Sequence, residues 1–275
     1  MSTRPELIDV DCNLWHKDLK SLQKKNIASS EIGYDPWNIL KEDAIATANI
    51  IAMLSPSSTI DEARLGLELL KTNPPPLAVK TTVGVHPYHV NDDEFSGKSL
   101  EEHGNIIRSL ISTNMDYCSA VGECGLDASE GFPPLEDQIP WFRLQVQIAQ
   151  ELGMPLFVHE RLAFAECLEI LEGVNVPVII HCFTGTKEQC AEYVKRGYSI
   201  SLSGYILRET NDNYADVIAC LTEGIIPLEK LMIETDSPYM VSCKTFTFEG
   251  PLYVSQVSRS SCLSSLSTSE HKALL

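Results

Sequence analysis

Five apolar stretches of this 275-residue chain each end in a polar side chain that could bind a metal ion or transfer a proton. In chain order, these side chains are His86, Glu123, His159, His181 and Asp236. A single histidine or glutamate after an apolar stretch is usually an ordinary surface residue. When parallel strands close into a barrel, however, the side chains at their C-terminal ends converge on one mouth.

Four of these side chains make up a donor set that suits a divalent cation. Glu123, His159, His181 and Asp236 follow the fourth, fifth, sixth and eighth apolar strands expected along the chain. Two imidazoles and two carboxylates can hold Zn²⁺, Mn²⁺ or, with more water retained, Mg²⁺. The sequence therefore predicts a metal site at the mouth of a barrel.

The elements that must position these residues alternate regularly along the chain. Strands are expected at 7–12, 50–54, 79–85, 117–122, 156–158, 178–180, 199–202 and 231–234. Helices are expected at 37–47, 60–70, 100–111, 134–152, 163–171, 187–195 and 214–221. This alternation predicts a parallel α/β sheet, and eight strands favour a TIM (β/α)8 barrel. No glycine-rich phosphate loop follows the first strand, which counts against a dinucleotide-binding fold.

The last part of the chain has a different composition. Residues 1–240 are assigned to the metal-binding barrel, and residues 241–275 to a divergent Ser-rich C-terminal tail. Serine competes for backbone hydrogen bonds and is a poor helix former. The eighth helix of the barrel is therefore expected to be degenerate or missing.

Composition limits the partners and the compartment. A net charge of -17 argues against a passive nucleic-acid coat, but bound divalent cations can reverse the field locally in an enzyme site. Nine cysteines without a Cys-x-x-Cys pair are expected to be free thiols in a reducing compartment. The sequence shows neither a signal peptide nor a membrane span. We expect an intracellular protein, in the cytoplasm or alternatively the nucleus.

Several segments resemble the TatD family of metal-dependent deoxyribonucleases over most of residues 7–239. They are Gly84–Pro87, Val121–Asp127, Val158–Arg161, His181–Gly185 and Glu234–Pro238. The resemblance implies an amidohydrolase-type barrel that hydrolyses DNA phosphodiester bonds, commonly as a 3′–5′ exonuclease on single-stranded or frayed ends. It also implies that Glu123 bridges two metal ions, that His159 and His181 hold one, and that Asp236 holds the other.

The first strand departs from the pattern of bacterial family members. Where they carry a His-x-His pair, this chain has Asp11 and Asn13, as in the eukaryotic branch. Both residues are candidate weak metal ligands, and one of two ions could bind weakly. Oxygen ligands favour the harder ions, so Mg²⁺ or Mn²⁺ is expected ahead of Zn²⁺.

The same residues suggest a mechanism. A metal ion held at the site would lower the pKa of a water molecule, and Asp236 would take its proton, so Asp236 and Glu123 are the expected catalytic residues. His86 and Arg161 could hold phosphate oxygens or support neighbouring residues instead. Asp127 could position a metal-binding imidazole.

Two other functions remain open from the sequence. The same barrel could be an amidohydrolase that acts on a small molecule, or it could be catalytically inactive. The sequence also leaves open the choice of DNA or RNA, of internal or terminal cleavage, and the oligomeric state.

Overall fold

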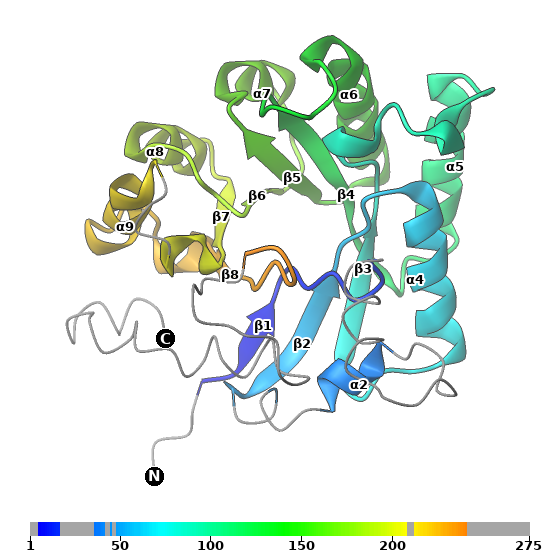
Figure 1. Ribbon diagram of the computed structural model, residues 1–275, viewed down its shortest axis with the longest axis horizontal. Coiled ribbons are helices and arrows are strands. Elements are labelled where there is room, and N and C mark those ends of the chain that lie inside the picture. The colour runs from blue at the N-terminus through cyan, green and yellow to red at the C-terminus, as the bar shows by residue number, and fades with distance from the viewer. Residues whose placement is uncertain (1–4, 17–35, 42–44, 46–47, 208–211, 241–275) are drawn as a thin grey trace.

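The computed structural model describes residues 5–16, 36–41, 45, 48–207 and 212–240. Within these residues, eight parallel strands pair in the order of the sequence. They are β1 (Leu7–Asp9), β2 (Ile50–Ser55), β3 (Ala78–Val83), β4 (Cys118–Asp127), β5 (Leu156–Arg161), β6 (Val178–His181), β7 (Ser199–Leu202) and β8 (Leu231–Ile233). The predicted α/β barrel is confirmed (Figure 1).

The first and last strands meet at the seam of the barrel. The Val10 amide donates to the Ile233 carbonyl at 3.2 Å, and the Asp236 amide donates to the Asp11 carbonyl at 2.8 Å. Cys12 and Ser237 form a parallel bridge just beyond. These contacts nearly close the sheet and place the end of β8 against the end of β1.

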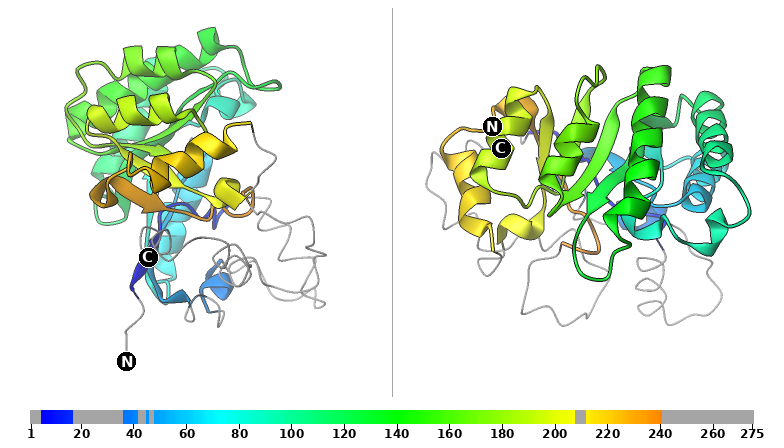
Figure 2. Two further views of the ribbon diagram at one scale, coloured as in Figure 1. Left: turned by 90° about the vertical axis from the view of Figure 1, so that its left-hand side faces the viewer. Right: turned by 90° about the horizontal axis from the view of Figure 1, so that it is seen from above.

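The helices lie outside the strands (Figures 1 and 2). They are α2 (Trp37–Leu40), α4 (Ile60–Thr72), α5 (Leu100–Ser112), α6 (Leu135–Leu152), α7 (Phe164–Ile170), α8 (Lys187–Lys195) and α9 (Tyr214–Thr222). Short 3-10 turns are η1 (Pro87–His89), η2 (Asp93–Phe95), η3 (Gly204–Leu207) and η4 (Leu228–Lys230). Helix α5 begins at a capping box, in which Ser99 and Glu102 satisfy each other's backbone N–H groups.

The main core lies between the strands and the helices. Val121 and Leu156 on the strands are completely buried, as are Ile107 and Phe142 on the helices. Such packing fixes the strand ends rigidly, so the side chains on them or just after them start from a rigid scaffold.

Strand β4 is longer than the 117–122 predicted, because the segment expected to be a turn after Gly122 continues as strand to Asp127. Gly125 explains how this happens. Its φ is 141°, and a Cβ there would collide with the carbonyl oxygen of His159. Only glycine lets β4 and β5 approach so closely, and this approach brings the β4 carboxylates beside the β5 imidazole.

Two predicted regions fall partly or wholly outside the described residues. Helix α2 ends at Leu40, whereas the expected helix ran to 47, through residues that are only partly described. The segment 241–275, for which a Ser-rich tail and a degenerate or missing eighth helix were predicted, also lies outside. In the described part of the chain, no helix combines the length and the apolar character needed to cross a membrane.

Candidate metal centre

Glu123 lies at the centre of the barrel mouth. Its Oε1 atom is 3.4 Å from Nδ1 of His159 on β5 and 2.7 Å from Nε2 of His181 on β6. The structure thus brings together three of the four predicted ligands. Asp236 lies beside them, after β8. The ligand atoms that lie close to one another form two groups, however, and neither group contains Asp236.

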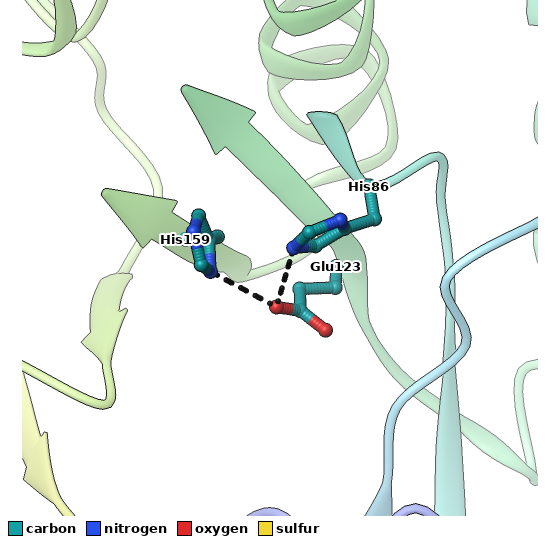
Figure 3. Close-up of side chains that lie close together, drawn as sticks. All are labelled: His86, Glu123 and His159. Carbon is teal, nitrogen blue, oxygen red and sulfur yellow. Dashed lines mark ion pairs between the residues drawn. The ribbon is translucent and has the colours of Figure 1, made fainter. Parts of the chain in front are cut away.

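The first group consists of His86, Glu123 and His159, which come from three successive strand ends (Figure 3). His86 Nε2 is 3.3 Å from Glu123 Oε1. The other ring nitrogen of His86, Nδ1, accepts a hydrogen bond from the Tyr88 amide at 3.1 Å, so Nε2 is the nitrogen that faces the carboxylate. Burial lowers the pKa of His86 to about 4, which keeps the imidazole neutral, as a metal ligand must be.

The second group consists of Asp11, His181 and Glu234. His181 Nδ1 lies 3.2 Å from Asp11 Oδ2 and 3.6 Å from Glu234 Oε1. Burial raises the pKa of Asp11 well above its usual value. Burial opposes a charge on His181, but Glu123, Asp11 and Glu234 together raise the pKa of His181 well above its usual value.

Unsatisfied polar atoms show that this second group fits a cation. Both carboxylate oxygens of Asp11, both ring nitrogens of His181 and Oε1 of Glu234 are buried without a hydrogen-bond partner among the described residues. The 2.7 Å approach of Glu123 to His181 does not have the direction of a hydrogen bond. Buried polar atoms are costly when left unpaired, and a divalent ion would satisfy this combination of oxygen and nitrogen donors.

Asp236 belongs to neither group, yet it is firmly held. The side-chain amide of Asn13 donates to Asp236 Oδ1 at 3.3 Å and to the Ser237 carbonyl at 3.2 Å. The backbone of Asp236 is left-handed, with φ of 46°. Burial, and next the charge of Glu234, raises the pKa of Asp236 to about 7. Asn13, a predicted weak ligand, therefore turns a donor group toward the Asp236 carboxylate.

A buried aspartate that the sequence analysis did not single out joins the seam. Asp9 accepts hydrogen bonds from the Thr235 amide at 2.9 Å and from the Thr235 hydroxyl at 2.8 Å. Asp9 and Asp11 are two residues apart, as are Glu234 and Asp236. Glu234 was missed as well, although it follows β8 directly and its position at a strand end was the available signal.

Arg161 lies at the end of β5 and is partly buried. It makes no side-chain hydrogen bond or ion pair with any residue that the structure describes, and its charge acts on the nearby Tyr205. The prediction that Arg161 holds a phosphate oxygen is compatible with this position. His86 was also predicted to hold a phosphate oxygen, but its Nε2 atom lies beside the Glu123 carboxylate instead.

Asp127 holds the His159 ring, as the sequence suggested. Its Oδ2 atom is 2.7 Å from His159 Nε2, which directs Nδ1 at Glu123. We expect Asp127→Asn to lower metal affinity or activity by about 10- to 100-fold, because an amide can donate to Nε2 and so favour the wrong tautomer. Metal titration of nuclease activity measures this. The same substitution at exposed Asp116 is the control, and equal effects at both positions would contradict the assigned role.

Comparisons with known proteins agree with this fold and identify a family. The family model described as TatD related DNase matches residues 8–267. A protein of Salmonella typhimurium named 3′-5′ ssDNA/RNA exonuclease TatD is 32% identical over 78% of this chain and 78% of its own length. Among solved structures, a TatD family hydrolase from Entamoeba histolytica superposes with a TM-score of 0.71 at 23% identity, over 93% of this chain and 84% of that one. A TatD homologue from Escherichia coli gives 0.69 at 21% identity, over 92% and 86% of the two chains. The chain belongs to the TatD related DNase family of metal-dependent hydrolases.

Proposed function

We propose that this chain is a divalent-metal-dependent nuclease that hydrolyses DNA phosphodiester bonds as a 3′–5′ exonuclease. The observation that carries the proposal is the pair of ligand groups that meet at Glu123 in the barrel mouth. Family membership supports the reaction class, and the name of the Salmonella typhimurium relative supports single-stranded substrate and 3′–5′ direction.

The two ligand groups provide for one or two ions. His86, Glu123 and His159 would hold one, and Asp11, His181 and Glu234 would hold the other. A divalent ion at such a site neutralises charge on the phosphate and makes a bound water more acidic. Two carboxylates in the second group favour Mg²⁺ or Mn²⁺ there, whereas the two imidazoles of the first also suit Zn²⁺.

The remaining residues orient the substrate and move protons. Asp236 accepts the proton of the attacking water, and Asn13 holds Asp236 in the required orientation. Arg161 donates to non-bridging phosphate oxygens through its planar fork of N–H groups. Asp127 keeps the Nδ1 atom of His159 directed at Glu123.

Two finer assignments accompany the proposal. The oxygen-bearing Asp11 and Asn13 in place of a His-x-His pair support a place in the eukaryotic branch of the family. A nucleic-acid substrate supports an intracellular location, in the cytoplasm or the nucleus.

The test is time-resolved digestion of 5′- and 3′-labelled oligonucleotides, both single-stranded and duplex. We expect Mg²⁺ or Mn²⁺ to support stepwise shortening of the 5′-labelled single strand, and EDTA to stop it. A protein that leaves nucleic acid intact but opens small amides or lactones would be the alternative amidohydrolase. One that acts on neither substrate would be an inactive barrel.

Metal binding should release protons. Burial raises the pKa of Asp11, a member of the second ligand group, so its carboxyl keeps a proton to a higher pH than an exposed aspartate does. An ion bound by Asp11 must displace this proton, and its affinity should therefore rise as pH increases. Calorimetric titration with Mn²⁺ in buffers of different ionisation enthalpy measures the release at about pH 6 and about pH 8. Buffer-independent heats at both values would contradict it.

A further inference from the structure

Two aromatic side chains form a ledge beside the first ligand group. Tyr88 lies on η1, and Phe132 lies in the loop between β4 and α6. Their ring centroids are 5.3 Å apart, and the ring planes are at 81°. We call this pair, Tyr88 and Phe132, the aromatic ledge.

The ledge adjoins both imidazoles of that group. The Phe132 ring centroid is 6.0 Å from that of His86 and 6.2 Å from that of His159, and it is within 16° of parallel to His159. Figure 3 shows both imidazoles directed at the carboxylate of Glu123, which lies on β4 between the strands that carry them. The Tyr88 amide donates to His86, which fixes the ledge relative to the site.

The core does not account for these rings. Tyr88 is 51% exposed, and neither ring belongs to the apolar cores of the described residues. Large aromatic side chains left at the surface commonly mark a binding site when they border a functional cleft. The two ring planes are nearly perpendicular, so a planar, uncharged partner that stacks on the face of one ring meets the edge of the other. A nucleobase is such a partner.

Charge gives a second argument. The chain carries a net charge of -17, which repels a nucleic acid at long range. Of the described arginines, Arg64, Arg108, Arg143 and Arg196 are all paired with carboxylates, and Arg161 alone has no ion pair. Among the described arginines, few are thus free to bind phosphates, so contacts that do not depend on charge matter more beside the metal ions. Base stacking on aromatic rings is such a contact, and it tolerates any sequence.

We propose that an unpaired nucleobase next to the scissile phosphate stacks on the aromatic ledge of Tyr88 and Phe132. This inference rests on the proposed nuclease function and adds the feature that selects its substrate. A base within a duplex is already stacked and paired, so only single strands and frayed ends can reach the ledge. The hydroxyl of Tyr88 has no part in this, because stacking uses the face of the ring.

The first test compares two oligonucleotides that differ only in whether the terminal nucleotides carry bases or are abasic. Tyr88→Leu and Phe132→Leu should each lower kcat/KM about tenfold on the base-bearing strand and leave it unchanged on the abasic strand. Tyr88→Phe should retain wild-type behaviour. Met115→Ser removes a similarly exposed apolar residue before β4, at the opposite end of the barrel, and is the control. Equal losses on both strands would overturn the proposal, because they would mean that the rings only support the ligands.

The second test measures stacking without hydrolysis. A single strand with 2-aminopurine near its 3′ end is titrated with the Asp236→Asn protein in Mg²⁺, and binding is followed separately by anisotropy. We expect the protein to quench the 2-aminopurine fluorescence, and the additional leucine substitutions to abolish quenching. If the leucine variants quenched as strongly as the parent protein, the stacking proposal would be wrong. Digestion of the unlabelled strand by the wild-type protein would still support the nuclease function in that case. Absence of digestion and of binding together would overturn both proposals.

Discussion

Glu123→Gln is expected to lower kcat/KM on a labelled single strand by about a thousandfold or more, a size that losing a central charged group at an active site can reach. Glu123 Oε1 lies within 3.4 Å of imidazole nitrogens from His86, His159 and His181, and no other described carboxylate contacts all three. Glutamine keeps the shape of the side chain but removes its negative charge, and it replaces one carboxylate oxygen with an NH2 group that cannot bind a metal ion. Both ligand groups should lose affinity together, so metal analysis of the purified variant should show a reduced content.

Glu160→Gln provides a matched control for this variant. Glu160 follows His159 directly, so its side chain points to the other face of β5, where it accepts hydrogen bonds from Tyr193 at 3.0 Å and from the Ala163 amide at 3.0 Å. Burial raises the pKa of Glu160, so a neutral side chain there is tolerated. We expect the kcat/KM of this variant to stay within about threefold of wild type, which corresponds to less than about 1 kcal/mol. If the Glu123 variant stayed equally active, the metal centre would be misassigned.

Most of the barrel could be predicted because local signals agree with the fold. The helix at 187–195 and the strand at 199–202 have the predicted bounds, since Thr186 caps the first and apolar residues fill the second. Strand β4 was predicted too short, because Gly122 and Gly125 read as turn residues. Their role depends on how closely β5 passes, which is a tertiary fact that a local pattern does not contain.

The site was predicted in part, for a related reason. Strand-end residues such as Glu123, His159 and His181 follow from the order of strands, so their meeting was predictable. Whether His86 or Asp236 joins Glu123 in a ligand group depends on the register and the twist of the strands around the barrel. Contacts such as Asp9 with Thr235, which are 226 residues apart, exist only because the barrel closes. Glu234 was visible in the sequence, but its carboxylate became a candidate ligand only when β6 placed His181 beside it.

Asp236→Asn is expected to lower kcat by about 10²- to 10⁴-fold at saturating metal, the range for removing a general base. The substitution preserves Oδ1 as an acceptor for the Asn13 amide, so the segment after β8 should keep its position. Wild-type activity should fall as pH drops, because protonated Asp236 cannot accept a proton, and the variant should lack this acidic limb. A pH series of kcat at several Mn²⁺ concentrations measures both effects.

The same series separates the two roles that Asp236 could have. Loss of a ligand would raise the metal concentration needed for half-maximal activity, whereas loss of a base lowers the maximum itself. Because Asp236 lies outside both ligand groups, we expect the second outcome. Asp116→Asn, in the exposed turn before β4, controls for the change of charge. A variant with an unchanged maximum, a shifted metal requirement and an intact acidic limb would make Asp236 a ligand and leave the proton to another group.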